Sequence, residues 1–323
     1  MGKLVYLGKE LESHWLDSGV ADISELNEVR TNYYKTTKQQ ALKQLNKILT
    51  DGGVKQDKIF KYYFENIAND TLVDFSKWTI NEMLASDELL SLFINKSKSN
   101  DKVFTSSDLT NNVRTAIRLG GKGYARPVTQ FPLKENKRFI NVTGKIIGDM
   151  ASGWGTRMIA AASTGNNYVG FEVNPPLIEK LNELGHDIQS ILPNFKFKII
   201  AHGSEILYNE LVGHVSQIIT SPPYFDLESY TQNGDEVYAG TYNAFRDKFL
   251  YPMTENALKY LKNGGELYIN IKDSKKASSM TDLKQYAKSH NLNTKLGSLK
   301  NISRTLSNGS HLNGDEDVLI IKK

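Results

Sequence analysis

Apolar residues recur along the first third of the chain at the spacing of amphipathic helices. The segment TKQQALKQLNKILTDGG places its apolar side chains on one helical face and closes on Gly52-Gly53, a pair that typically caps the C-terminus of a helix. KIFKYYFENIA, TINEMLASDELLSLFI and TSSDLTNNVRTAIRLGG show similar patterns. Together they predict a helical N-terminal region over residues 1–120.

The pattern changes near residue 120, where short apolar runs begin to alternate with helical segments. Six runs are typical of strands, at about 145–150, 168–173, 196–203, 215–221, 266–272 and 316–323. Strands that alternate with helices indicate a parallel, doubly wound sheet. We therefore expect an α/β domain over residues 121–323.

The composition is that of a globular protein without thiol chemistry: 39% of the residues are hydrophobic and 24% are charged. There is no cysteine, which excludes disulfides, thiolate metal sites and cysteine nucleophiles. The six histidines lack metal-ligand spacing, so we expect no metal. A net charge of +4 permits nucleic-acid binding without demanding it. No apolar stretch suits a signal peptide or a membrane span, and we expect a soluble cytoplasmic protein.

A glycine turn follows the first predicted strand, in the sequence GDMASGWGTRMIAA. Gly153 and Gly155 would let the backbone approach a ligand closely, and Glu172, at the end of the next strand, suits ribose hydroxyls. Met158 stands where a dinucleotide-binding turn needs its third glycine, which disfavours an NAD-dependent oxidoreductase. The turn suits a nucleoside without a pyrophosphate, such as S-adenosylmethionine. An ordinary strand-to-helix turn would explain the glycines equally well.

The fourth predicted strand ends on Ser-Pro-Pro-Tyr, residues 221–224. With the glycine turn, this motif resembles those of the DNA amino-methyltransferases, which use S-adenosylmethionine to methylate exocyclic nitrogens of adenine or cytosine. Their fourth-strand motif, Asp/Asn/Ser-Pro-Pro-Tyr/Phe/Trp, is matched position for position. Their glycine motif usually reads D-P-F-x-G-x-G-T. It is matched at Asp149, Gly153, Gly155 and Thr156, whereas Met150 and Ala151 replace the Pro and the Phe.

A third segment, RPVTQFPLK at 126–134, resembles the H-P-T-Q-K-P-L segment that touches the methionine end of the cofactor in one branch of this family. The likeness rests on Arg126, Pro127, Thr129, Gln130 and Pro132. An extra valine, Arg for His and Phe for Lys make it partial. The whole resemblance covers about residues 124–323.

The resemblance implies a Rossmann-like methyltransferase fold and two sets of site residues. The catalytic set is Ser221, Pro222, Pro223 and Tyr224. The cofactor-binding set is Asp149, Ala151, Ser152, Gly153, Trp154, Gly155, Thr156, Glu172, Ser204, Arg126, Pro127 and Thr129. A helix cap would explain Ser204 equally well, and a partly exposed hydrophobe would explain Trp154.

The Ser-Pro-Pro-Tyr residue types suit methylation of an exocyclic amine. Such a nitrogen is a poor nucleophile because its lone pair is delocalised into the ring. The Ser221 hydroxyl and the Pro222 carbonyl can accept hydrogen bonds from its two N–H groups. The prolines hold these acceptors rigid by fixing φ at about −65°. Tyr224 offers a stacking face for a flipped base, worth about 1–3 kcal/mol. Because there is no cysteine, methylation at carbon 5 of cytosine is excluded.

The implied partner is DNA, and double-stranded DNA would need base flipping. The polar connection over 226–241 is a candidate loop that orders on substrate binding. The helical region, including Arg114 and Arg118, is the best candidate for holding the duplex. The basic and aromatic residues of KIFKYY are a further candidate, although a solvated helix face with core aromatics is the simpler explanation.

Several alternatives stay open at this level. Serine in the first motif position favours cytosine N4 without excluding adenine N6, and the setting is a restriction–modification system or a phage. A related enzyme could act on RNA or protein. A non-catalytic nucleic-acid-binding protein could keep the same fold.

Overall fold

The computed structural model describes residues 5–6, 9–10, 19–73, 77–98, 106–119, 128, 131–225, 228–229, 240–274, 276–305 and 311–323. The chain divides into two compact units. Unit 1 comprises Met1–Thr36, Glu65–Val128 and Thr305–His311, and unit 2 comprises Thr37–Phe64, Thr129–Arg304 and Leu312–Lys323. This division differs from the single boundary expected near residue 120, because residues 37–64 pack with the α/β domain.

Unit 1 is mainly helical. Its elements are α1 (Ile23–Tyr33), α4 (Glu65–Ala68), α5 (Ile80–Ala85), α6 (Asp87–Ser97) and α7 (Leu109–Leu119), with the short strands β1 (Val5–Tyr6), β2 (Lys9–Glu10) and β3 (Leu72–Val73). Buried side chains that include Leu26, Leu90 and Val113 join α1, α6 and α7 into one core. The unit therefore has a hydrophobic core of its own.

A helical hairpin, α2 (Lys38–Asp51) and α3 (Asp57–Tyr63), opens unit 2. α2 begins after Thr37, whose hydroxyl accepts the N–H of Gln40 in a capping box, and it ends at Gly52 with φ of +73°. The predicted helix with its glycine stop is thus confirmed. The hairpin contacts α9 (Thr156–Ser163) and α10 (Pro175–Ile191).

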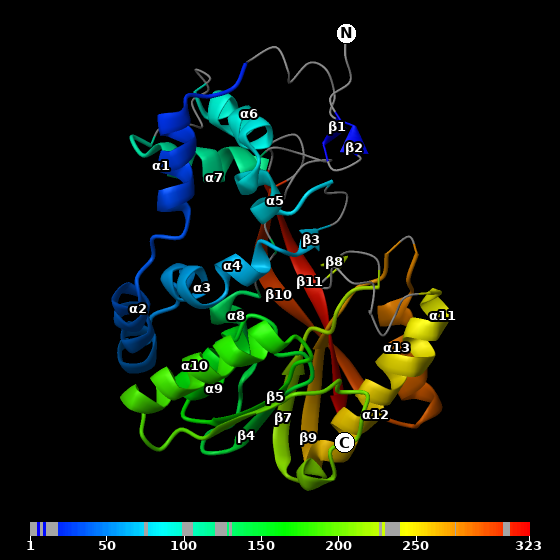
Figure 1. Cartoon of the computed structure of the whole chain (residues 1–323). Helices are drawn as coiled ribbons and strands as arrows, with labels where there is room; N and C mark the ends of the chain where they lie inside the picture. The colour runs from blue at the N-terminus through cyan, green and yellow to red at the C-terminus, as the bar shows by residue number, and fades with distance from the viewer. Residues whose placement is uncertain are drawn as a thin grey trace. The chain divides into compact units, whose positions relative to one another are not determined.

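Seven strands form the sheet of unit 2, in the order β10-β11-β9-β7-β4-β5-β6 (Figure 1). They are β4 (Ile146–Asp149), β5 (Asn167–Phe171), β6 (Phe197–Ile200), β7 (Val215–Thr220), β9 (Leu261–Asn270), β10 (Asn293–Thr305) and β11 (His311–Lys322). Along the run β9-β7-β4-β5-β6 each strand is parallel to the next. β11 is antiparallel to β9 on the other side. The sheet is therefore mostly parallel.

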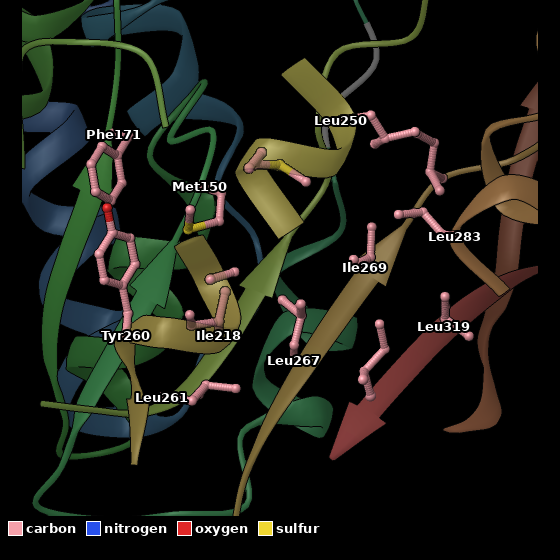
Figure 2. Close-up of a cluster of buried hydrophobic side chains, with 14 of the residues drawn as sticks. Met150, Phe171, Ile218, Leu250, Tyr260, Leu261, Leu267, Ile269, Leu283 and Leu319 are labelled. Carbon is pink, nitrogen blue, oxygen red and sulfur yellow. The ribbon is translucent and has the colours of Figure 1, made fainter. Parts of the chain in front are cut away.

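Both faces of the sheet are covered. Ile218 and Ile219 are neighbours on β7 and so point to opposite faces. Ile218 belongs to a large core cluster with residues of α12 (Tyr251–Tyr260) and α13 (Ser279–Ser289), part of which Figure 2 shows. Ile219 packs in a second cluster with Phe139, the last residue of α8 (Leu133–Phe139). The predicted doubly wound α/β class is confirmed.

The segment after Thr241 is helical but is not one continuous α-helix. It forms α11 (Tyr242–Phe245), a π-helical turn η3 (Arg246–Leu250) and then α12; the short elements η2 (Asn209–Leu211) and β8 (Glu228–Ser229) precede it. Pro252 stands at the start of α12. Its missing N–H and its ring prevent a regular i to i−4 ladder through the preceding turn, and the wider π turn accommodates the break.

Candidate functional site

The glycine turn and the Ser-Pro-Pro-Tyr motif leave the same edge of the sheet. β4 ends at Asp149 and β7 at Thr220, and the two strands are parallel neighbours with Ile147 opposite Gln217. The strand order reverses at β4, because β5 lies beside it on one side and β7 lies beside it on the other. Such a switch point is where doubly wound folds bind ligands.

The two turn glycines have different surroundings. Both have positive φ, +49° at Gly153 and +68° at Gly155. A Cβ on Gly155 would lie 2.9 Å from Leu184 Cδ2 and 3.2 Å from Phe64 Cζ, so the backbone packs tightly there. A Cβ on Gly153 would meet nothing nearer than the Ala151 carbonyl oxygen at 3.9 Å. Only Gly153 therefore leaves open space beside the turn.

Asp149 is fully buried and does not face that open space. Its Oδ2 accepts from Arg157 Nε at 2.6 Å and from the Tyr168 hydroxyl at 2.9 Å, and its Oδ1 accepts the Ala151 N–H at 3.2 Å. The Ala151 carbonyl accepts from Arg157 in turn. Asp149 and the Ala151 backbone are thus bonded within the protein, and these bonds shape the turn.

Ser152 and Thr156 are also buried. The Ser152 N–H donates to the Phe171 carbonyl at 2.9 Å, and its Oγ lies 3.1 Å from the Tyr168 hydroxyl. These contacts tie the turn to the end of β5. Sequence reasoning missed both Arg157 and Tyr168. The available signal was Arg157 itself, a lone charge at the start of the otherwise apolar helix RMIAAA.

Glu172 lies beside the turn, immediately after β5. Its Oε2 accepts the Gly153 N–H at 3.2 Å, and its Oε1 accepts the N–H groups of Val173 and Asn174 at 3.0 Å each. Burial raises the pKa of the Glu172 carboxyl, and the three N–H donors oppose that rise. The carboxylate is partly exposed and keeps lone pairs for a further donor.

Trp154 packs against the α2–α3 hairpin. Its ring centroid lies 5.9 Å from that of Phe60 and 6.4 Å from that of Phe64, in edge-to-face arrangements. A partly buried Trp154 therefore belongs to a small aromatic group that supports the turn from outside.

Ser204 follows β6 at the same sheet edge and is buried. Its carbonyl accepts from Asn256 Nδ2 at 3.1 Å, whereas its hydroxyl has no hydrogen-bond partner among the described residues. The helix cap offered as an alternative for Ser204 is not formed, since no helix begins there. A buried hydroxyl without a partner is uncommon in folded proteins.

The Ser-Pro-Pro-Tyr segment continues β7 without helix or strand structure. Pro222 is buried, while Ser221, Pro223 and Tyr224 are partly exposed. Tyr224 and Phe225 rest against the large core cluster, and Phe225 contacts the rings of Tyr242 and Phe245, each at 5.7 Å. The core thus holds the motif in place from one side.

Three of the expected cofactor contacts, Arg126, Pro127 and Thr129, lie outside the described residues, as does Gln130. The proposed loop over 226–241 falls largely outside them too. The remaining site residues come from the ends of four adjacent parallel strands, β6, β5, β4 and β7.

The two arginines expected to hold DNA, Arg114 and Arg118, have different surroundings. Arg114 is not free to hold phosphate, because its guanidinium pairs with Glu65, donates to the Tyr33 carbonyl and lies 3.9 Å from the Tyr33 ring centroid. Arg118 is exposed on α7. Unit 1 carries 12 Lys and Arg residues against 14 Asp and Glu residues. Its charge therefore gives no general attraction for DNA.

The tyrosines of KIFKYY follow the simpler explanation. Tyr63 is 2% exposed, and its hydroxyl donates to Asp187 at 2.5 Å. Tyr62 reaches Glu183 at 3.3 Å. Both hydroxyls bond α3 to α10, and Tyr63 is buried whereas Tyr62 is partly exposed.

The described residues contain neither a metal-binding cluster nor a helix that could span a membrane. No group of three His, Asp or Glu side chains there is arranged to hold a metal ion. None of the helices in that part of the chain combines the length and apolar character needed to cross a membrane.

No protein-family model matches the sequence, and no curated protein does. The structure is similar to an rRNA methylase from Streptococcus thermophilus, with 14% identity and a TM-score of 0.39 over 61% of this chain and 98% of that one. It is similar to a putative methyltransferase from Streptococcus mutans in complex with SAH, with 14% identity and a TM-score of 0.40 over 61% and 100%. It is also similar to a precorrin-6y C5,15-methyltransferase from Geobacter metallireducens, with 9% identity and a TM-score of 0.41 over 59% and 86%. These values are too low to transfer an activity.

Proposed function

We propose that this chain transfers a methyl group from S-adenosylmethionine to an exocyclic amino nitrogen of a base in DNA, N4 of cytosine or N6 of adenine. One observation carries the proposal: the glycine turn and Ser-Pro-Pro-Tyr extend neighbouring parallel strands at the point where the strand order reverses. A cofactor at the turn and a base at the motif would then be adjacent.

The residues at the turn suit S-adenosylmethionine. Gly153 leaves space for close approach, Glu172 offers carboxylate lone pairs for ribose hydroxyls, and the buried Ser204 hydroxyl has no partner among the described residues. Met158, which is fully buried in α9, occupies the position at which a pyrophosphate-binding turn has its third glycine. Bound S-adenosylmethionine supplies an activated methyl group.

The motif supplies the acceptors that an amino nitrogen needs. The Ser221 hydroxyl and the Pro222 carbonyl accept hydrogen bonds from the two N–H groups of the amine, so that the nitrogen approaches tetrahedral geometry and its lone pair is no longer shared with the ring. The C–N bond forms as the C–S bond to the methyl group breaks, and the nitrogen releases one proton to solvent. Pro222 is buried and the following residues rest on the core, which keeps both acceptors fixed. Tyr224 stacks on the base once it has been flipped out of the duplex. Most of the acceleration then comes from positioning.

The substrate could instead be RNA. The partial exposure of Ser221 and Tyr224 suits any extruded base, so labelling of nucleosides in DNA and in RNA distinguishes the two substrates.

The proposal predicts that Ser221→Ala and Tyr224→Ala each lower methyl transfer to DNA by about 100-fold, because each misplaces the base or its amino group. The measurement is transfer of labelled methyl groups at saturating cofactor, with binding of S-adenosylhomocysteine measured by calorimetry. We expect that binding to change by less than about threefold.

Two variants serve as controls. Ser216→Ala removes a hydroxyl from the same strand away from the motif, and Tyr224→Phe keeps the stacking ring. Both should keep most of the activity. Full activity in Ser221→Ala and Tyr224→Ala would show that the site is assigned wrongly.

A further inference from the structure

A buried ion pair lies directly beneath the glycine turn. Asp149 is 0% exposed and Arg157 is 7% exposed, and Arg157 Nε lies 2.6 Å from Asp149 Oδ2. Asp149 ends β4, and Arg157 is the second residue of α9. The pair therefore joins the strand before the turn to the helix after it.

Both charges also bond to the backbone of the turn. Asp149 Oδ1 accepts the Ala151 N–H at 3.2 Å, and Arg157 Nη2 donates to the Ala151 carbonyl. The two polar groups of Ala151 are thus held by opposite charges.

The third member of the cluster is Tyr168 on β5. Its buried hydroxyl donates to Asp149 Oδ2 at 2.9 Å and lies 3.1 Å from Ser152 Oγ. The Phe131 ring lies 5.9 Å from the Arg157 guanidinium on another side. Every charged or hydroxyl group of the cluster therefore has a partner, and two successive turn residues, 151 and 152, are bonded to it.

Burying two charges is costly unless geometry and hydrogen bonds compensate. A lysine at 157 could keep the ion pair, but its compact ammonium lacks the planar fork that reaches a carboxylate and a carbonyl together. What only arginine provides here is the second contact, to the Ala151 carbonyl. That contact, to a neutral backbone group, fixes the conformation of the turn.

We propose that Arg157, supported by Tyr168, is a positioning residue that holds the glycine turn in its cofactor-binding shape. The inference rests on the proposed function. Arg157 is buried and acts through the Ala151 peptide on Gly153, whose N–H is bonded to Glu172. The shape of the open side of the turn, and with it the affinity for the cofactor, depends on the buried guanidinium.

The test is Arg157→Lys in the full chain, with S-adenosylhomocysteine as the calorimetric probe. We expect its Kd to rise about tenfold and the KM for S-adenosylmethionine to rise similarly. Once the cofactor saturates, kcat should stay within about threefold of the wild-type value, because Ser221 and Tyr224 are unchanged. A loss confined to kcat would overturn the inference.

The matched control is Arg114→Lys. Arg114 is a second arginine whose guanidinium bonds to a carboxylate, that of Glu65, and to a backbone carbonyl, but it is partly exposed and lies in unit 1. Both variants should lower Tm, and only Arg157→Lys should weaken binding of S-adenosylhomocysteine. Equal weakening in both would mean that affinity follows stability, and would contradict a positioning role.

If Arg157→Lys does not fold, Tyr168→Phe tests the same cluster without removing a charge. It should raise the Kd for S-adenosylhomocysteine about threefold, and an unchanged Kd would overturn the inference. Failure of the two proposals can be told apart. Wild-type protein that does not bind S-adenosylhomocysteine contradicts the proposed function itself, whereas normal binding in wild type and in both variants contradicts only the role of the cluster.

Discussion

Gly153 and Gly155 stand two residues apart and are required for different reasons. Gly155 packs against Leu184, Leu181 and Phe64, so it is needed by the fold. Gly153 has a positive φ but open space around its missing Cβ. A ligand that approaches the turn would meet Gly153 first.

We therefore predict that alanine at the two positions has separable effects. Gly155→Ala forces a side chain into a left-handed conformation and against Leu184, and should lower the free energy of unfolding by about 2 kcal/mol or more. Gly153→Ala should cost only about 1 kcal/mol, yet weaken binding of S-adenosylhomocysteine about tenfold. Urea titration and calorimetry measure the two quantities. Wild-type affinity in a folded Gly153→Ala protein would be inconsistent with a cofactor at this turn.

At this scale the sequence identifies the motif residues but not their surroundings. Gly153, Gly155, Glu172 and Ser221 stand out because their residue types at that spacing suit a known chemistry. Whether Asp149 faces a ligand or the core depends on Arg157 and Tyr168, which approach it from α9 and β5. Such a cluster forms only when three elements pack together, so a linear pattern cannot reveal it.

The individual helices follow their local signals closely. The capping boxes of α2 and α5 involve Thr37 with Gln40 and Thr79 with Glu82, pairs that are readable as Thr-x-x-Gln/Glu. α7 is preceded by Asp108, whose Oδ1 accepts the Asn111 N–H at 3.1 Å. This bond lowers the pKa of the Asp108 carboxyl, and the nearby Lys35 adds to the effect.

A pH-dependent stability effect follows for α7. A carboxyl whose pKa is lowered on folding contributes stability above its unfolded value of 3.8, and loses that contribution as the pH falls through the lower, folded value. Asp108→Ala should lower the free energy of unfolding by about 1 kcal/mol at pH 7, and by less as the pH falls below 3.8. Urea titrations across this range measure the difference.

Asp108→Asn is the control, because asparagine caps a helix about as well as aspartate and does not titrate. It should keep most of the stability at every pH. A cost for Asp108→Ala that is the same at pH 3 and pH 7 would show that the charge of Asp108 contributes nothing to the cap.

Element boundaries were predictable only where the signal was local. The glycine stop of α2 is in the sequence, but the break at η3 required weighing Pro252 against an otherwise continuous helical pattern. The assignment of residues 37–64 to unit 2 was not predictable. It rests on contacts such as Tyr63 with Asp187, which join residues 124 positions apart.

At the scale of the molecule, the mostly parallel character of the sheet follows from the alternation of strands and helices, and the antiparallel β11 beside β9 completes it. The charge is divided unevenly. The whole chain has 40 basic and 36 acidic residues, whereas unit 1 has 12 basic and 14 acidic residues. The positive excess therefore lies in unit 2. Unit 2 also holds the glycine turn and Ser-Pro-Pro-Tyr.

The most direct test of the account is to incubate the protein with labelled S-adenosylmethionine and unmethylated duplex DNA, and then to digest the DNA to nucleosides. We predict label in N4-methylcytosine or N6-methyladenine, none in 5-methylcytosine, and almost none with Ser221→Ala. Parallel incubations with RNA and with protein complete the measurement. Label in RNA or protein but not in DNA would contradict the proposed substrate, and no label in any of them would contradict methyl transfer itself.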